Sequence, residues 1–355
     1  MERNTPEKDL RIETIRGLAL LLMVAGHVIG DTATAGMQVS EDSFLRYLYD
    51  SLVYVRMPLF TAISGYVYAL RPLGPQSALW RFQQGKLRRI VLPMVVVSTL
   101  FFISQMIAPG ANAKSEWAEM YNIYIYGYSH FWFLQAIFCI FLMISLLDKF
   151  ECLNTLPKAL IGIALATLAS LNYEAFPDLF SFKSGIHLLP FFMLGLSVYR
   201  FSGHLSQMPI QLTMFAVLIV TVAMNQSYLW DHADFSEGEI ALIGTALGLA
   251  AIYLLIVRRF YFAPLAWLGR YSFEIYLLHV FGTAGTRIAL GKLGVQNDSV
   301  IFFCCLLVGL ALPVAVKLVA GRIPLADLML FGAKPARKST VRQPRTTFKA
   351  RESTR

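Results

Sequence analysis

Long apolar runs alternate with short polar connections along most of the chain. A helix needs about 20 apolar residues to cross a lipid bilayer, and ten runs reach or approach this length. They cover residues 15–34, 44–70, 90–108, 130–147, 158–172, 185–200, 210–227, 239–257, 265–289 and 298–320. The pattern predicts an all-α, polytopic membrane protein with about ten transmembrane helices. The fifth and sixth runs are short, so the number could differ by one or two.

The composition agrees with lipid as the main solvent of the chain. Hydrophobic residues make up 56% of the sequence and charged residues only 15%, against roughly 25% charged residues in soluble domains. These values exclude a soluble enzyme, a disordered protein and a disulfide-rich scaffold. The four cysteines show no CxxC spacing, so we expect neither disulfides nor a metal site. We predict one membrane domain at 1–325 and a basic, disordered tail at 326–355.

Lysine and arginine are distributed unequally between the connections. If the N-terminus is cytoplasmic, most of them fall in cytoplasmic segments, above all in the 71–89 connection and the tail. The opposite connections contain only Lys114, Lys183 and Lys292, and the 228–239 connection is acidic. Because basic residues favour the cytoplasmic side, we predict that both termini are cytoplasmic. The basic tail would then lie near anionic lipid, and we expect no nucleic-acid partner.

Several ionisable side chains occur inside the apolar runs. Each costs about 2.5–3.5 kcal/mol on insertion scales, so such residues usually face a polar cavity and mark a functional site. The candidates are His27, Arg56, His130, His187, Glu274, His279 and Arg287.

Arg16 and His27 lie eleven residues apart in the first run. In a helix this spacing places both on one face, about 16 Å apart along the axis. A guanidinium suits a phosphate, and a histidine suits general-base chemistry. The face therefore fits a long ligand with a phosphorylated head and a reactive far end, such as acyl-coenzyme A (acyl-CoA). Alternatively, Arg16 is an anchor at the inner surface and His27 a hydrogen-bonded packing residue.

Asp31 and Arg56 each allow two interpretations. Asp31 follows His27 by one turn and either orients its imidazole or is a helix-end residue in water. Arg56 precedes Pro58, which kinks a helix. Arg56 is either a functional charge or part of a packed, kinked helix near an outer vestibule.

The fourth and ninth runs carry further candidates. His130 and Trp132 open the fourth run at the outer interface, where aromatic residues are expected in any membrane protein. Glu274 and His279 are five residues apart in the ninth run, so they point to different faces of its helix. Both must find partners, whereas Arg287 lies nearer the outer end and can reach interface water.

Several catalytic motifs are absent from the sequence. It has no Walker A motif, which excludes an ATP-driven pump, and neither a GxSxG nor an HExxH motif. No nucleophilic serine or cysteine stands out. Direct transfer assisted by a base therefore fits the sequence better than a covalent intermediate.

Six short motifs, in order between about residues 8 and 285, resemble the acyltransferase-3 family of integral membrane acyltransferases. RIETIRGLALLLMVAGHV is similar to the family's opening, whose R-X10-H motif falls on Arg16 and His27. MPLFTAISGYVYAL resembles its second-helix stretch, and FQQGKLRRIVLP its basic stretch, with a basic pair at Lys86 and Arg89. HFWFL, LPFFMLGL and LGRYSFEIYLLH are similar to later signatures. Some relatives have arginine at the position of Lys86, and lysine lacks bidentate geometry, which leaves its contact open.

The resemblance implies transfer of an acyl group, acetyl or succinyl, from cytoplasmic acyl-CoA to a sugar hydroxyl. Acetyl-CoA or succinyl-CoA would be the donor substrate, and no permanently bound cofactor is expected. The acceptor would be a glycan or lipid-linked oligosaccharide that approaches from the outer side of the bacterial inner membrane. Acceptors in the family include O-antigen, exopolysaccharide, periplasmic glucan and Nod-factor sugars.

The resemblance implies that Arg16 and His27 are essential, and our mechanistic hypothesis assigns roles to further residues. His27 would be the general base, and Arg16 would be essential. Three residues would hold the CoA phosphates: Arg16, Lys86 and Arg89. Four residues would contact the acceptor or stabilise the developing oxyanion: Arg56, His130, Trp132 and Glu274.

Two other classes of function stay open at this stage. A multi-pass transporter of a glycan precursor or small metabolite would also use many helices and buried charges. The chain shows no repeated half with broken helices, which many transporters have, and a transporter would leave its substrate chemically unchanged. A membrane sensor or assembly partner would leave the six motifs without a chemical role.

Overall fold

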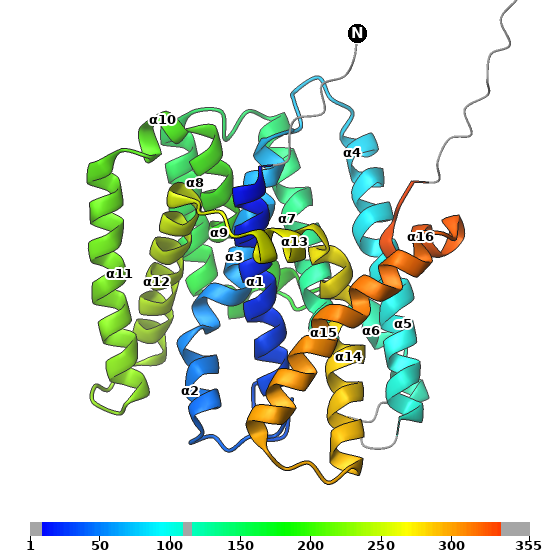
Figure 1. Cartoon of the computed structure of the whole chain (residues 1–355). Coiled ribbons are helices and arrows are strands. Elements are labelled where there is room, and N and C mark those ends of the chain that lie inside the picture. The colour runs from blue at the N-terminus through cyan, green and yellow to red at the C-terminus, as the bar shows by residue number, and fades with distance from the viewer. Residues whose placement is uncertain (1–8, 109–115, 335–355) are drawn as a thin grey trace, which may run out of the picture.

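The computed structural model describes residues 9–108 and 116–334. Within these two ranges the chain is helical and contains no strand. Ten longer helices form a bundle (Figure 1): α1 (Leu10–Ile29), α3 (Val53–Ala69), α5 (Leu92–Ile107), α7 (Trp132–Lys149), α8 (Leu156–Leu171), α9 (Phe182–Arg200), α11 (Met208–Leu229), α12 (Glu237–Arg258), α14 (Ser272–Lys292) and α15 (Asp298–Ala320).

Shorter helices connect and cover these ten. The α-helices among them are α2 (Phe44–Ser51), α4 (Leu79–Lys86), α6 (Asn122–Ile125), α10 (Ser202–Leu205), α13 (Ala263–Arg270) and α16 (Pro324–Phe331). The others are the π-helical turn η1 (Leu87–Val91) and the 3₁₀ turns η2 (Trp117–Glu119), η3 (Ser129–Phe131) and η4 (Tyr173–Ala175).

Each of the ten predicted runs overlaps one of the ten longer helices. In the described residues, seven helical segments are long and apolar enough to cross a membrane. They are α1, α4 continued into α5, the segment that ends with α7, α9, α11, α12 and α15. Helices α3 and α8 have only 17 and 16 residues, and α14 carries Glu274, His279 and Arg287 among its apolar residues. The chain is thus a multi-pass membrane protein, and a count of ten spans remains a prediction.

The two ends of the bundle differ in charge. The end where α1 begins, here called the basic end, also carries Lys149, Arg200 and Arg258 in the last turns of α7, α9 and α12. The opposite end carries the acidic connection between α11 and α12, including Asp231 and Asp234. The unequal distribution of Lys and Arg between the two ends is the basis of the prediction that the basic end is cytoplasmic.

The helical body extends past residue 325, where the sequence analysis placed its end. Helix α16 (Pro324–Phe331) crosses that boundary and packs against α5, and Phe331 is buried. This segment packs against the helical body because burial of its apolar side chains is favourable. Residues 335–355, the rest of the predicted tail, lie outside the described part of the chain.

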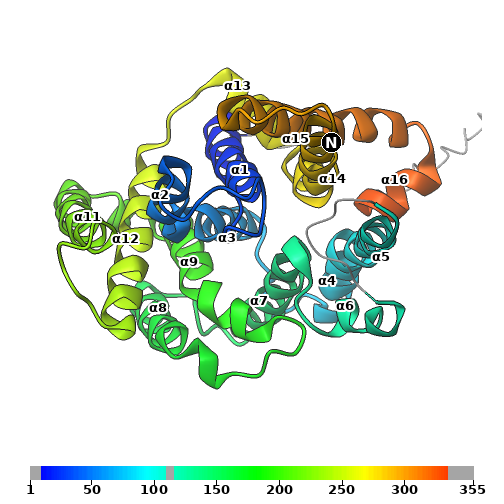
Figure 2. The ribbon, with the colours of Figure 1, turned by 90° about the horizontal axis from the view of Figure 1, so that it is seen from below.

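Glycines let the central helices approach one another closely. On α3 and α9, a Cβ added to Gly65 would overlap the carbonyl group of Phe192, and one added to Gly195 would overlap that of Ala62. Small residues at such contacts are typical of helix packing in membranes, where apolar burial alone does not drive association. Figure 2 shows α1, α3 and α9 in the interior and α11 at the periphery, where α11 exposes most of its side chains.

Candidate active site

Three histidines from distant parts of the chain meet in the half of the bundle away from the basic end. His27 comes from the last turn of α1, His130 from η3 and His279 from α14. Their ring centroids lie 4.9 Å apart for His27 and His279, 4.8 Å for His130 and His279, and 6.1 Å for His27 and His130. We call these three residues the histidine cluster.

The local sequence fixes the position of His27. Asp9 caps the start of α1 through a hydrogen bond from the backbone N–H of Arg11, which is a common helix start. Gly30 adopts a positive φ of 89° that ends the helix, a conformation that glycine adopts without steric cost. The buried Arg46 donates a hydrogen bond to the carbonyl of Gly30, so the turn after His27 is held by α2.

Both ring nitrogens of His130 have partners. Its Nε2 lies 3.3 Å from the carbonyl oxygen of Leu277, and its Nδ1 lies 3.3 Å from the hydroxyl of Ser129. The hydroxyl of Tyr276 donates to the backbone carbonyl of His130. Ser129 takes a left-handed backbone conformation, with φ of 46°, which is uncommon for a residue other than glycine. These contacts tie η3 to α14.

His279 is fully buried and is held at one nitrogen only. Its Nδ1 lies 2.8 Å from the carbonyl oxygen of Tyr276 and 3.1 Å from that of Ile275. Its Nε2 is buried without a hydrogen-bond partner among the described residues. Most buried polar atoms in proteins are hydrogen-bonded, so this exception is a functional candidate.

A cavity of about 1570 Å³ reaches from the basic end toward the histidine cluster. We call it the basic cavity, because seven basic side chains of the described residues line it but only two acidic ones, Asp9 and Glu13. The basic residues are Arg16, Arg71, Arg81, Lys86, Arg89, Arg200 and Arg259. Clustered positive charge in a cleft attracts anionic ligands, and guanidinium groups match phosphate geometry.

The structure brings Arg16, Lys86 and Arg89 together on this cavity. Arg16 donates from Nη1 to both carboxylate oxygens of Glu13, each at 2.9 Å. Nζ of Lys86 lies 3.1 Å from the ring centroid of Phe141, a cation–π arrangement. The sequence analysis named these three basic residues as phosphate contacts, but it did not predict that four others line the same cavity.

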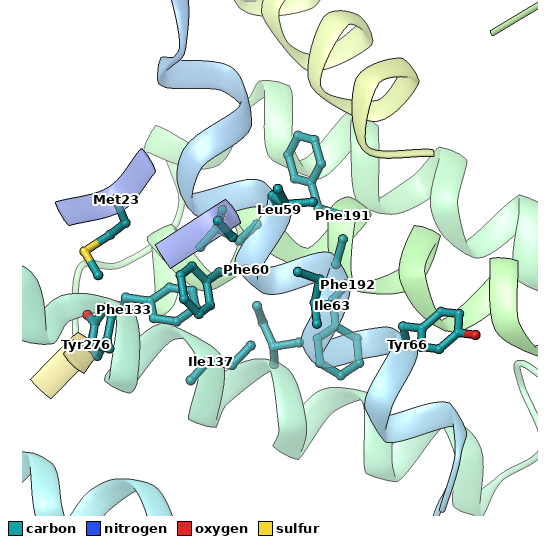
Figure 3. Close-up of a cluster of buried hydrophobic side chains, with 14 of the residues drawn as sticks. Met23, Leu59, Phe60, Ile63, Tyr66, Phe133, Ile137, Phe191, Phe192 and Tyr276 are labelled. Carbon is teal, nitrogen blue, oxygen red and sulfur yellow. The ribbon is translucent and has the colours of Figure 1, made fainter. Parts of the chain in front are cut away.

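Three aromatic side chains close the deep end of the basic cavity. Phe60, Phe133 and Tyr276 all line it, and their rings pack together in the core (Figure 3) with centroids 5.4–6.4 Å apart. On the other side of this aromatic wall, the ring of Tyr276 lies 5.8 Å from that of His130 and 6.3 Å from that of His279. The wall therefore separates the basic cavity from the histidine cluster.

A second cavity of about 310 Å³, here called the outer cavity, lies on the far side of the cluster. Its lining shares no residue with that of the basic cavity. The polar residues on it are His27, Ser104, Gln105, Ser129, Thr283 and Arg287. His27 is exposed to this space, so the histidine predicted as the base can meet a ligand there. Ligand sites are commonly concave, with a few convergent polar groups.

Arg56 packs directly behind His27. Its guanidinium lies over the ring of Tyr49, 3.7 Å from the centroid, and contacts Gly26, where an added Cβ would overlap it. Nε of Arg56 is buried without a hydrogen-bond partner in the described residues. The structure thus places a nearly buried positive charge beside the helix turn that carries His27.

Comparison with known proteins gives these cavities a chemical context. The acyltransferase-domain model of the acyltransferase-3 family matches residues 9–318, which include all three histidines and both cavities.

The chain belongs to the acyltransferase-3 family. Its apolar helices agree with a multi-pass membrane member of this family. It is also similar to a curated protein, the nodulation protein NolL of Mesorhizobium japonicum (strain LMG 29417 / CECT 9101 / MAFF 303099), with 24% identity over 259 residues. The match covers 71% of this chain and 64% of that relative's length. No solved structure matches the chain.

Two other predicted site residues of this family member, Glu274 and Trp132, lie away from the histidine cluster. Glu274 lies 3.6 Å from Nζ of Lys317 in an ion pair, and Lys317 also contacts Asp327 at 2.5 Å. Trp132 is half-buried, with its ring against Phe133, and lies in the lining of neither cavity. An acceptor role for Glu274 or Trp132 remains a prediction, and neither residue is positioned to reach the outer cavity in this conformation.

Two further ionisable residues also lie apart from the histidine cluster. Asp31 is exposed beyond the end of α1, in the position of a helix-end residue. His187 contacts Ser170 between α8 and α9, 3.3 Å from its hydroxyl.

Sequence reasoning noted His279 as an ionisable residue inside an apolar run but assigned it no role. The sequence signal for His279 was the free-energy cost of placing an ionisable side chain in a membrane helix, because such a side chain needs a partner. Its neighbours could not be predicted, since His27 lies at the other end of the sequence and meets it only through packing of α1 against α14. Among the described residues, no group of histidine, cysteine or carboxylate side chains has the geometry of a metal site.

Proposed function

We propose that this member of the acyltransferase-3 family is an acyltransferase that transfers an acetyl or succinyl group from acyl-CoA to a sugar hydroxyl of a surface glycan such as an exopolysaccharide or O-antigen. The observation that carries the proposal is the pair of cavities on opposite sides of the histidine cluster, one lined by seven basic side chains and one whose polar side chains are neutral except for His27 and Arg287. A donor with several phosphates and an acceptor with hydroxyl groups need this combination.

The donor would enter from the basic end. The phosphates of acyl-CoA would contact Arg16, Lys86 and Arg89, which lie near the entrance, and the acyl thioester would reach toward the aromatic wall. Arg16 and His27 are about 16 Å apart along α1 at 1.5 Å per residue, a separation that a long, thin thioester arm can bridge. Passage of the acyl end to His27 requires the side chains of Phe60, Phe133 and Tyr276 to move apart.

The acceptor would bind in the outer cavity, where its hydroxyl meets His27. His27 takes the proton from the hydroxyl as the oxygen attacks the thioester carbonyl. The new carbon–oxygen bond forms, the carbon–sulfur bond breaks, and the proton passes from His27 to the departing CoA sulfur. Arg56 is close enough to this turn of α1 to favour negative charge on the attacked carbonyl oxygen. The apolar bundle would keep water from the thioester.

The family supports a glycan acceptor, because its acceptors include Nod-factor sugars and other glycans. The similarity to a nodulation protein agrees with an acceptor of this kind. A transporter of glycan precursors is the alternative from another class. It would move its substrate without forming an ester, so mass spectrometry of the glycan separates the two functions.

The test is the acyl-ester content of the host's surface glycans, measured by proton NMR. A deletion strain would be complemented with the wild type, with His27→Ala, or with His204→Ala as the control, since His204 is exposed on α10. We expect esters with the wild type and the control but not with His27→Ala, at equal protein levels in the membrane. Equal ester content with His27→Ala would show that His27 is not the base, and esters unaffected by the deletion would exclude these glycans as acceptors.

A further inference from the structure

The unpartnered nitrogen of His279 is an acceptor whose direction is set by the backbone. Its Nδ1 faces two carbonyl oxygens, those of Tyr276 and Ile275. Carbonyl oxygens only accept hydrogen bonds, so Nδ1 must carry a hydrogen. A neutral imidazole has one N–H, and Nε2 therefore presents a lone pair. This lone pair is fully buried and has no hydrogen-bond partner in the described part of the chain.

Two histidine rings lie beside the ring of His279, and only one of them is suited to donate a hydrogen bond to its Nε2. His130 already uses Nε2 toward the carbonyl of Leu277 and Nδ1 toward Ser129. The ring of His27 lies 4.9 Å from that of His279, centroid to centroid. No hydrogen bond joins the two rings in this conformation, and rotation of the His27 side chain would bring one of its nitrogens to Nε2 of His279. His27 also borders the outer cavity, so it stands between the buried acceptor and the space for a ligand.

A general base needs a defined tautomer. Neutral imidazole exists in two forms, and only the form with its lone pair toward the substrate hydroxyl can take the proton. In serine proteases a buried carboxylate fixes this form by accepting the other N–H of the base. Asp31 is exposed beyond the end of α1 and does not occupy such a position. His279 lies beside His27, and its own orientation is fixed by backbone carbonyls.

We propose that His279 is a positioning residue, whose Nε2 accepts a hydrogen bond from one ring N–H of His27 and holds the other His27 nitrogen toward the outer cavity as the base. This inference rests on the proposed function, in which His27 is the base. It assigns to a neutral histidine the orienting role that a carboxylate has in other sites, and it avoids a buried negative charge inside the membrane.

Two matched substitutions separate this role from simple packing. His279→Gln puts an amide oxygen near the position of Nε2, where it can still accept from His27. His279→Asn keeps a donor near the position of Nδ1 for the carbonyl of Tyr276 but cannot reach His27. Both are polar, neutral and smaller than or similar to histidine, so loss of packing alone would affect His279→Asn and His279→Gln in the same direction.

The assay uses membrane vesicles from the complemented deletion strain, titrated with acetyl-CoA or succinyl-CoA, with CoA thiol release as the readout. We expect kcat to fall about 10- to 100-fold in His279→Asn, the usual range for loss of a partner that orients a site residue. KM for the donor should not change, because His279 does not line the basic cavity. His279→Gln should keep most of the wild-type kcat.

The outcomes distinguish the two levels of the proposal. If the wild type releases no thiol and forms no ester, the proposed function fails and the catalytic role of His279 fails with it. If the wild type is active and His279→Asn matches it, or if His279→Gln is as impaired as His279→Asn, the positioning role is wrong while the proposed function stands.

A second measurement does not depend on activity or on the folding of a variant. Nitrogen-15 NMR of histidine-labelled wild-type protein in lipid reports which ring nitrogen carries the hydrogen. We expect His279 protonated at Nδ1 with a hydrogen-bonded Nε2, its signals assigned by their loss in His279→Gln. A hydrogen on Nε2 of His279 would overturn the inference.

Discussion

The imidazole rings of His27 and His279 lie 4.9 Å apart, although one belongs to α1 and the other to α14. His27 borders the outer cavity, while His279 is buried behind it with one nitrogen held by backbone carbonyls. In the proposed mechanism the two residues would divide two tasks that general-base chemistry requires: His27 would contact the substrate and His279 would orient the base. The basic cavity stops on the other side of the aromatic wall, at Tyr276.

Replacement of Arg16 by alanine should weaken donor binding. A hydrogen bond to a charged group contributes about 1.5–3 kcal/mol, which corresponds to a rise of roughly 10- to 100-fold in KM for acetyl-CoA. Arg11→Ala is the matched control, because Arg11 is exposed on the same helix and does not line the cavity. Thiol-release kinetics in vesicles would check both, and an equal effect of the two substitutions would argue for a general charge effect instead of a phosphate site.

Truncation of the aromatic wall should widen the choice of acyl group. Phe133→Ala removes a ring from the deep end of the basic cavity, so the enzyme should accept hexanoyl-CoA better relative to acetyl-CoA. A change of at least about tenfold in this ratio is expected, since one methylene of fit changes specificity by 1–3 kcal/mol. The control is Phe138→Ala on the same helix, whose ring faces Phe180 outside the cavity. An unchanged ratio in Phe133→Ala would place the acyl group elsewhere.

An added methyl group at Gly195 should destabilise the bundle. Its Cβ would overlap the carbonyl of Ala62 on α3, and helix backbones cannot yield as a flexible side chain can. Overpacking costs about 1–3 kcal/mol or more, so Gly195→Ala should lower the Tm measured in detergent. Gly238→Ala serves as the control, because nothing lies within 4 Å of its added Cβ. A Tm equal to that of Gly238→Ala would mean that α3 and α9 can move apart to fit the added methyl group without a loss of stability.

The ion pair between Arg200 and Asp148 should hold the rim of the basic cavity. Arg200 donates to both carboxylate oxygens at 2.9 and 3.0 Å, and Tyr68 donates to the same carboxylate at 2.8 Å. Arg200→Met leaves Asp148 buried without its cation, which costs about 3–5 kcal/mol in proteins.

Thermal unfolding would show this loss for Arg200→Met. Arg258→Met is the control for charge, as Arg258 is exposed at the end of α12. The double variant Arg200→Met/Asp148→Leu should recover much of the loss, because no charge then stays buried and unpaired. A double variant as unstable as Arg200→Met would assign the effect to packing.

Much of the candidate site could be predicted from the spacing of residues within one helix. Arg16 and His27 share a helix, so their separation along its axis follows from the number of residues between them. Lys86 and Arg89 share one helical segment, and the structure places both on the cavity that Arg16 also lines. Contacts between helices were not accessible in this way. The sequence predicted no partner for Glu274, which pairs with Lys317 of α15. It also did not predict that Arg56 contacts Gly26 of α1.

The sequence by itself determined that the chain forms helices and lies in a membrane, because an apolar run in lipid must satisfy its backbone groups internally. It also determined which connections are basic and which residues share a face of α1. Only the tertiary structure decided that His27, His130 and His279 meet between two cavities. Which helices become neighbours depends on close contacts such as those of Gly65 and Gly195, and these are set by the shapes of whole packed surfaces, which no local pattern of residues contains.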